Sequence, residues 1–141
     1  MQINSVIDAI AVKLHEAFDD GYTIYDDAVP QNFREPAFFI LLLEPNLSKL
    51  IGNRYLNTLP FDIHYFGQGS RDAYAVLEKL MVEMEFITCT NGDMLHGTKM
   101  NGHYEDGVLH FFVNYNFHVL KVTEREDSME GLSINGSLRG D

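Results

Sequence analysis

Two imidazoles and a carboxylate near a predicted hairpin turn could together bind a metal ion. Asp-Gly at 106–107 is typical of a two-residue turn, and alternating polar and apolar residues flank it on both sides. In that register Glu105 pairs with Val108, and His103 lies opposite His110. Side chains directly opposite each other on paired strands have Cβ atoms within about 5 Å. Imidazole nitrogens and carboxylate oxygens are typical zinc ligands, so His103, His110 and Glu105 are a candidate metal-binding set.

The simpler interpretation of the same residues is an exposed strand end with polar side chains, and we favour it. His118 shares the face of His110, but eight residues of extended chain separate their Cα atoms by about 27 Å. These two histidines therefore do not form a site. We expect no catalytic residue, no cofactor and no metal, and His103, His110 and Glu105 are the set to test if a metal is found.

Other motifs that could carry chemistry are each incomplete. "HEAFD", residues 15–19, begins like the helix of zinc proteases, but Asp19 stands where the second histidine is needed. "GQGSRD", residues 67–72, lacks the lysine of a P-loop and the third glycine of a dinucleotide fingerprint. A turn leading into a helix capped by Ser70 explains it. Cys89 has no basic neighbours that would lower its pKa, so we expect a structural thiol.

Segments of helical and extended periodicity predict an α+β fold that positions these side chains. Apolar residues recur at helical spacing from Ile3 to Phe18, capped by Asn4 or Ser5, and again over 71–87. The element order is α-β-β-β-α-β-β, with a mixed or antiparallel sheet and both helices on one face. Residues 1–121 form one domain, and 122–141 form a polar arm or tail. The predicted strands are 22–27, 37–43, 54–66 (with Pro60 at a break, bulge or sheet edge), 94–105 and 108–120.

Two strands indicate which surfaces are buried. The segment 107–122 alternates with period two, so its odd-numbered apolar residues, Leu109 to Val119, form a core face, and its histidines and asparagines meet solvent or another subunit. "AFFILLL", residues 37–43, has no polar alternation, which predicts that both of its faces are covered. Because two helices cover only one face of the sheet, we expect the long hairpin or another subunit to cover the second.

Composition limits the possible partners and compartments. The 141-residue chain has 10 Lys and Arg against 21 Asp and Glu, a formal charge of −11, so stable nucleic-acid binding is not expected. A single cysteine is typical of a reducing compartment. We expect no secretory signal and no membrane association, because the longest apolar run falls short of the roughly 20 residues that span a bilayer.

The whole pattern resembles a known family. Its parts are "INSVIDAIAVKLHEAF", "YTIYDDAVPQNFREPAFFILLLEPN", "RYLNTLPFDIHYF", "GVLHFFVNYNFHVLK" and a late "SMEGLSI". Together, over roughly residues 3–134, they resemble the tail terminators of phages and prophages of Gram-positive bacteria. The resemblance rests on distributed strand and helix patterns, and no short motif transfers a role to a single residue.

The resemblance implies an assembly role without an active site. Tail terminators form a ring, usually a homohexamer, on the last ring of tail-tube protein, where they stop polymerisation and present a surface to the neck or head. In contractile tails and headless bacteriocin particles the equivalent protein caps tube and sheath. The implied location is the virion tail or tail-like particle, assembled in the bacterial cytoplasm, with DNA able to pass through the ring.

Two alternatives stay open from the sequence. One is another neck-connector or baseplate component of the same machine. The other is a small metal-dependent enzyme built on His103, His110 and Glu105.

Overall fold

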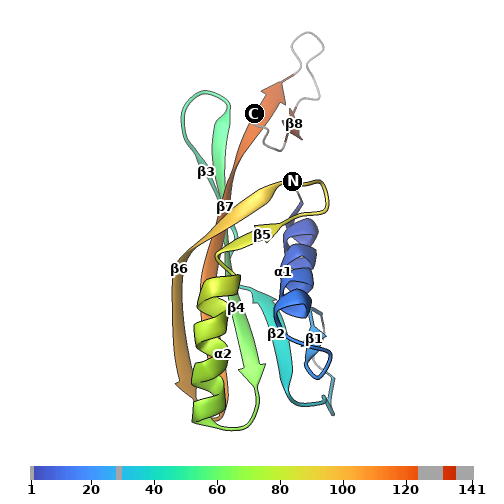
Figure 1. Cartoon of the computed structure of the whole chain (residues 1–141). Coiled ribbons are helices and arrows are strands. Elements are labelled where there is room, and N and C mark those ends of the chain that lie inside the picture. The colour runs from blue at the N-terminus through green and yellow to red at the C-terminus, as the bar shows by residue number, and fades with distance from the viewer. Residues whose placement is uncertain (1, 28–29, 124–131, 136–141) are drawn as a thin grey trace.

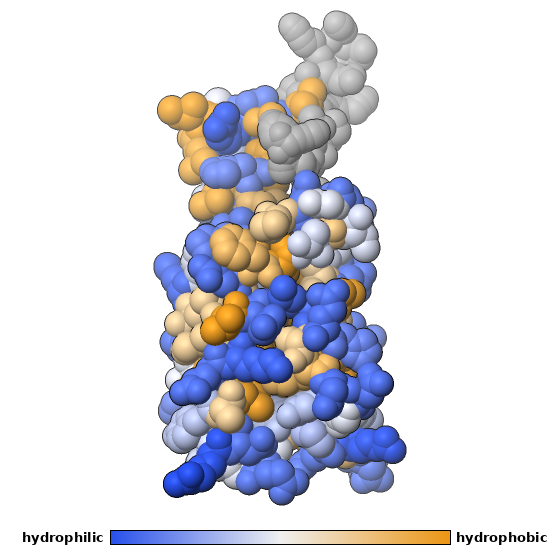
Figure 2. Space-filling view, viewed as in Figure 1, coloured by the Kyte–Doolittle hydropathy of each residue, from blue (hydrophilic) through white to orange (hydrophobic). Residues whose placement is uncertain are grey.

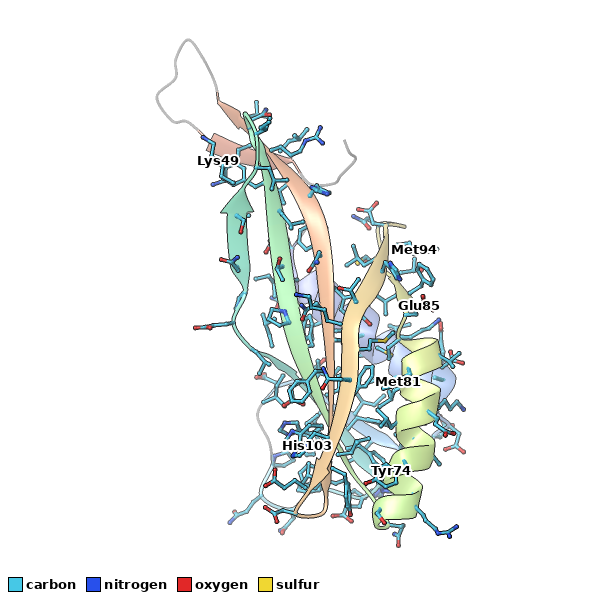
Figure 3. The ribbon with its side chains drawn as sticks, turned by 90° about the vertical axis from the view of Figure 1, so that its left-hand side faces the viewer. Lys49, Tyr74, Met81, Glu85, Met94 and His103 are labelled. Carbon is cyan, nitrogen blue, oxygen red and sulfur yellow. The ribbon has the colours of Figure 1, made fainter. Side chains whose placement is uncertain are left out.

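Two helices pack on one face of a mixed β-sheet (Figures 1 and 3). The computed structural model describes residues 2–27, 30–123 and 132–135. In them the helices are α1 (Ile3–Ala17) and α2 (Ser70–Glu83). The eight strands are β1 (Thr23–Tyr25), β2 (Ala37–Leu42), β3 (Asn46–Lys49), β4 (Arg54–Phe66), β5 (Phe86–Thr88), β6 (Met94–Glu105), β7 (Val108–Thr123) and β8 (Leu132–Asn135).

The sheet confirms the predicted α+β class and adds three short strands. Its order is β1-β2-β4-β7-β6-β5, while β3 pairs with β4 and β8 pairs with β7. Only the β1–β2 pairing is parallel among the described strands. The element order becomes α-β-β-β-β-α-β-β-β. The sequence analysis missed β3, β5 and β8 because strands of three or four residues are too short to show a period.

The predicted core face of β7 is confirmed. The two helices cover this face with apolar stripes at helical spacing. The buried side chains of β7 are Leu109, Phe111, Val113, Tyr115, Phe117 and Val119, each at most 5% exposed. Those of the helices are Val6, Ala9, Ile10 and Leu14 on α1 and Ala73, Val76 and Leu80 on α2.

The β6–β7 hairpin forms in the predicted register. Asp106 and Gly107 have φ of 55° and 80°, the left-handed conformations that a type I′ turn requires. Glu105 pairs with Val108, and His103 pairs with His110. A local turn signal therefore placed the two histidines opposite each other correctly.

Pro60 does not break β4, contrary to one predicted alternative, but it lies at a local edge of the sheet, as another alternative predicted. The strand runs unbroken from Arg54 to Phe66 and pairs with β7 along that length. The interruption lies in its other neighbour, because β2 ends at Leu42 and β3 begins at Asn46. The Leu43 N–H donates to the Pro60 carbonyl at 2.8 Å, so Pro60 faces the gap between these strands, where its missing N–H is not needed.

The helix ends differ from the predicted ones. At α1 the N-cap is Gln2, without a side-chain cap hydrogen bond, so neither Asn4 nor Ser5 is the cap. At α2 the N-cap is Gly69 and Ser70 is the first helical residue.

The second helix is also shorter than the predicted 71–87. Beyond Glu83 the carbonyls of Met84 and Glu85 accept hydrogen bonds from Tyr115 and from the Gly97 N–H instead of continuing the helix. Ile87, which we had placed on the helix, lies buried in β5.

The second face of β2 is covered by its own chain, which corrects the expectation of the hairpin or another subunit. Residues 37–40 are buried on both faces, as predicted, but Leu41 and Leu43 of the predicted segment 37–43 are 37% and 48% exposed, so the prediction is wrong for the end of the segment. The Phe33 ring centroid lies 5.0 Å from that of Phe39 and 4.9 Å from that of Phe66. Tyr25 stacks on Phe39 at 4.8 Å. The loop between β1 and β2 thus folds an aromatic ring over the strand, and burial of these residues does not require a partner.

A hairpin projects beyond the helices at one end of the molecule (Figure 1). It consists of β3, its turn and the first part of β4, residues 46–58, and we call it the β3–β4 hairpin. Figure 2 shows hydrophobic surface at this end of the molecule. In the hairpin, Leu47, Leu50 and Ile51 are 42%, 44% and 80% exposed. β7 continues alongside it past the predicted domain boundary at 121, and residues 132–135 of the predicted arm pair with β7. Residues 124–131 and 136–141 of that arm lie outside the described part of the chain.

Candidate functional site

Three side chains converge on the sheet face opposite the helices. Asp62 and His64 are two residues apart on β4, so their side chains lie on the same face. His110 lies directly across from His64 on β7. We call Asp62, His64 and His110 the Asp-His-His cluster.

A single carboxylate oxygen holds the cluster together. Asp62 Oδ2 lies 2.9 Å from His64 Nε2 and 3.1 Å from His110 Nδ1. An ionised carboxylate only accepts hydrogen bonds, so in that state each of these ring nitrogens carries the hydrogen and donates a hydrogen bond to Oδ2. The two imidazole rings meet edge to face with centroids 4.3 Å apart.

The carboxylate is buried and only half satisfied. The Asp62 side chain is 10% exposed, whereas the His64 and His110 side chains are 24% and 27% exposed. Asp62 Oδ1 is buried and has no hydrogen-bond partner in the described part of the chain. Buried polar atoms are nearly always paired, so this oxygen is an exception that needs a physical explanation.

The structure groups His110 with different residues from those selected in the sequence. The His103 and His110 rings face each other across the hairpin with centroids 6.4 Å apart. His103 Nε2 instead lies 2.8 Å from Glu105 Oε1, in an exposed pair at the turn end of the hairpin, where Figure 3 labels His103. Sequence analysis therefore found one of the three clustered residues.

The positions of Asp62 and His64 on a common strand face could have been predicted from the sequence. In "FDIHYF", residues 61–66, the two polar residues alternate with Phe61, Ile63 and Tyr65, which places them on one face of a strand. Bringing His110 to that face requires the β4–β7 register, which places His110 within hydrogen-bond distance of Asp62, 48 positions away in the sequence. No local pattern specifies this pairing.

The other motifs are occupied with internal contacts. In the first turn of α2, Asp72 Oδ2 accepts hydrogen bonds from the Gln68 N–H at 2.9 Å and from the Tyr65 hydroxyl at 2.6 Å. Cys89 is 3% exposed, and burial together with the Asp93 carboxylate raises the pKa of its thiol. A raised pKa disfavours the reactive thiolate, in agreement with a structural role.

One comparison with known proteins assigns the chain to a family. A family model described as "Phage tail terminator protein" matches residues 5–127, from the first turn of α1 to beyond the end of β7. The chain belongs to the phage tail terminator family. A search of curated protein sequences finds no match.

Family membership gives the general role of the chain. It is a phage tail structural protein, a component of the virion tail that interacts with other tail components, as the resemblance implied. The family is structural, so membership does not make the Asp-His-His cluster an active site. Neither helix of the described residues has the length and apolar composition needed to cross a bilayer.

Proposed function

We propose that this tail terminator caps the end of the tail tube, ends its polymerisation and joins the tube to the neck. The observation that carries the proposal is the family match over residues 5–127. In a headless contractile particle the same protein would cap tube and sheath. It acts by shape and surface, without catalysis.

The projecting β3–β4 hairpin supports contact with a neighbour in the particle. Leu47, Leu50 and Ile51 expose apolar surface there, and exposed apolar groups that cluster are typical of interaction sites. The hairpin extends beyond the helices and can therefore reach an adjacent subunit without disturbing the core (Figure 1). We propose that it contacts either the tube end or the next copy in the ring.

We infer that the working form is a closed ring of identical subunits, a homohexamer like the ring that tail terminators usually form. Among the described strands, β1 and β5 end the main path of the sheet and each pairs on one side only, so their outer edges could pair with a strand of another chain. The charge of −11 supports a channel through which DNA passes without adhering.

Tail length measures the capping role directly. We expect deletion of the gene in its phage or prophage to give overlong tubes in negative-stain images, and a plasmid copy to restore uniform length. Loss of all tubes would contradict capping, because failure of initiation is the result expected for a baseplate component.

Light scattering of the purified chain, alone and with tube subunits, tests the ring. We expect the mass of the complex with tube subunits to exceed that of the tube alone by six copies of this chain. A monomer that never adds to tubes would contradict the proposed assembly.

A further inference from the structure

We propose that Asp62, His64 and His110 bind a divalent transition-metal ion, with Zn²⁺ as the ion that best fits the ligands. This inference is independent of the capping role. It concerns a different set of residues from His103, His110 and Glu105 and is argued from the geometry of the Asp-His-His cluster alone.

The donor atoms already have the spacing of a metal site. One donor atom from each residue lies within 4.8 Å of the other two. The two nitrogens lie 2.9 and 3.1 Å from Asp62 Oδ2. Ligands at about 2.0–2.2 Å from a tetrahedral zinc ion are roughly 3.3–3.5 Å apart, so each nitrogen–oxygen pair would open by a few tenths of an ångström, and the two nitrogens, which lie within 4.8 Å of each other, would adjust to the same spacing.

The unpartnered oxygen is the second, independent observation. Asp62 Oδ1 is buried without a hydrogen-bond partner among the described residues, while Oδ2 accepts from both imidazoles. An ion between the three side chains would interact with the carboxylate as a whole, since carboxylates bind metals through one or both oxygens. One donor atom from each residue gives three protein ligands, and a water molecule can complete a four-coordinate shell.

Charge and access favour a cation at this position. In the described residues, the ion-pair partners of Asp62 are the two histidines. Histidine binds metals as the neutral imidazole, so the cluster presents a net negative charge to the ion. When the ion binds, the ring proton of each histidine moves to its other nitrogen, and the part-exposed rings leave a route from solvent.

The strands hold the ligands in place before the ion arrives. β4 and β7 pair continuously through the cluster, and His64 and His110 are direct partners in that register. Phe112 lies parallel to the His110 ring, with centroids 6.2 Å apart. A bound ion would connect the two central strands and stabilise the folded chain.

Cobalt binding is the direct test. Co²⁺ is added to the metal-free, untagged full-length protein, and the visible absorption of the bound ion reports its coordination number. Zn²⁺ then displaces Co²⁺, and competition with a chromogenic chelator gives the Zn²⁺ affinity. We expect one equivalent per chain. We also expect Asp62→Asn, His64→Gln and His110→Gln each to weaken Zn²⁺ binding by more than about 100-fold, since even outer-shell partners change affinity 10–100-fold.

Matched controls separate this site from other histidines. His103→Gln and His96→Gln remove imidazoles that pair with Glu105 and Glu85 at the surface, and we expect unchanged affinity. Absence of stoichiometric Co²⁺ binding, unchanged affinity in His64→Gln, or equal loss in His103→Gln would each overturn the proposal.

Thermal unfolding supplies a readout that does not depend on spectroscopy. At a Zn²⁺ concentration 100 times the Kd, the melting temperature should rise by at least about 5 °C. His64→Gln, folded by circular dichroism, should show no rise. An equal rise in that variant would overturn the proposal, whatever the tail-length assay shows for capping.

Discussion

Tyr115 shows how one hydroxyl joins the sheet to the end of a helix. Its ring lies in the core face of β7, and its hydroxyl donates to the Met84 carbonyl at 2.6 Å. That carbonyl lies just past α2, where helix geometry leaves acceptors without partners. Burial raises the pKa of Tyr115 well above its ordinary value.

Replacement of Tyr115 by phenylalanine should destabilise the fold. The change keeps the ring but leaves the Met84 carbonyl buried without its donor, which costs about 1–3 kcal/mol in the free energy of unfolding. Urea denaturation measures it. Tyr74→Phe is the control, because Tyr74 is 53% exposed and loss of a water-exposed hydroxyl should change the free energy by less than about 0.5 kcal/mol. Equal effects in the two variants would contradict the role of the hydrogen bond.

Stability should fall at alkaline pH because of the same tyrosine and Tyr65. Burial, with the Asp72 carboxylate in the case of Tyr65, raises the pKa of both groups above the ordinary value of 10.0. Below pH 10 both states keep the protons; above it only the unfolded chain releases them. Each tyrosine then lowers the free energy of unfolding by about 1.4 kcal/mol per pH unit. Denaturant curves from pH 8 to 11 should show this slope reduced in Tyr115→Phe, and an identical slope would refute the assignment.

Gly97 sets how closely β6 passes the end of α2. Its N–H donates to the Glu85 carbonyl at 2.6 Å. A Cβ atom there would lie 2.8 Å from the Met84 carbonyl oxygen and 2.9 Å from a Val113 methyl. Only glycine allows this approach of two backbones, which lets the chain turn from α2 into β5 and β6.

Gly97→Ala should therefore destabilise the protein by about 1–3 kcal/mol, the range for overpacked sites. Gly102→Ala on the same strand is the control. Its Cβ would meet the methyl groups of the Leu77 side chain, which can move aside, whereas the Met84 carbonyl belongs to the backbone. Thermal melts should show the larger loss for Gly97→Ala, and the reverse order would contradict the close-approach argument.

The whole molecule is a helix-covered sheet with a hairpin extending from one end (Figure 1). Phe33 covers Phe39 on the second face of β2, so burial of this part of the core does not require a partner. Surfaces for assembly must then be sought outside the core. The exposed apolar residues of the β3–β4 hairpin are such a surface.

Leu47→Ser with Ile51→Ser should impair assembly without unfolding the subunit. Both side chains are exposed, at 42% and 80%, so the melting temperature of the double variant should change little. If the pair contributes about 1.4 kcal/mol to the contact, capping of tubes should fall at least about 10-fold. Tube lengths measured after mixing with tube protein report capping. Val82→Ser is the control: it removes an apolar side chain on α2 that is 71% exposed, and we expect this variant to cap tubes like the unmodified protein. Equal capping by the unmodified protein, the double variant and Val82→Ser would exclude the hairpin from the interface.

Local periodicity determined the parts of this protein that depend only on neighbours in the chain. The helices, the two faces of β7 and the Asp106–Gly107 turn follow from period and turn chemistry, so His103 opposite His110 was predictable. Resemblance of the whole pattern also pointed to the family.

Only the tertiary structure decided which distant segments meet. It placed Asp62 and His64 beside His110, and it folded Phe33 over β2. A side chain's face is set by backbone geometry within a few residues, whereas strand order and loop cover depend on the packing of the complete chain. The sequence therefore specified what each strand presents, and the fold determined what those surfaces contact.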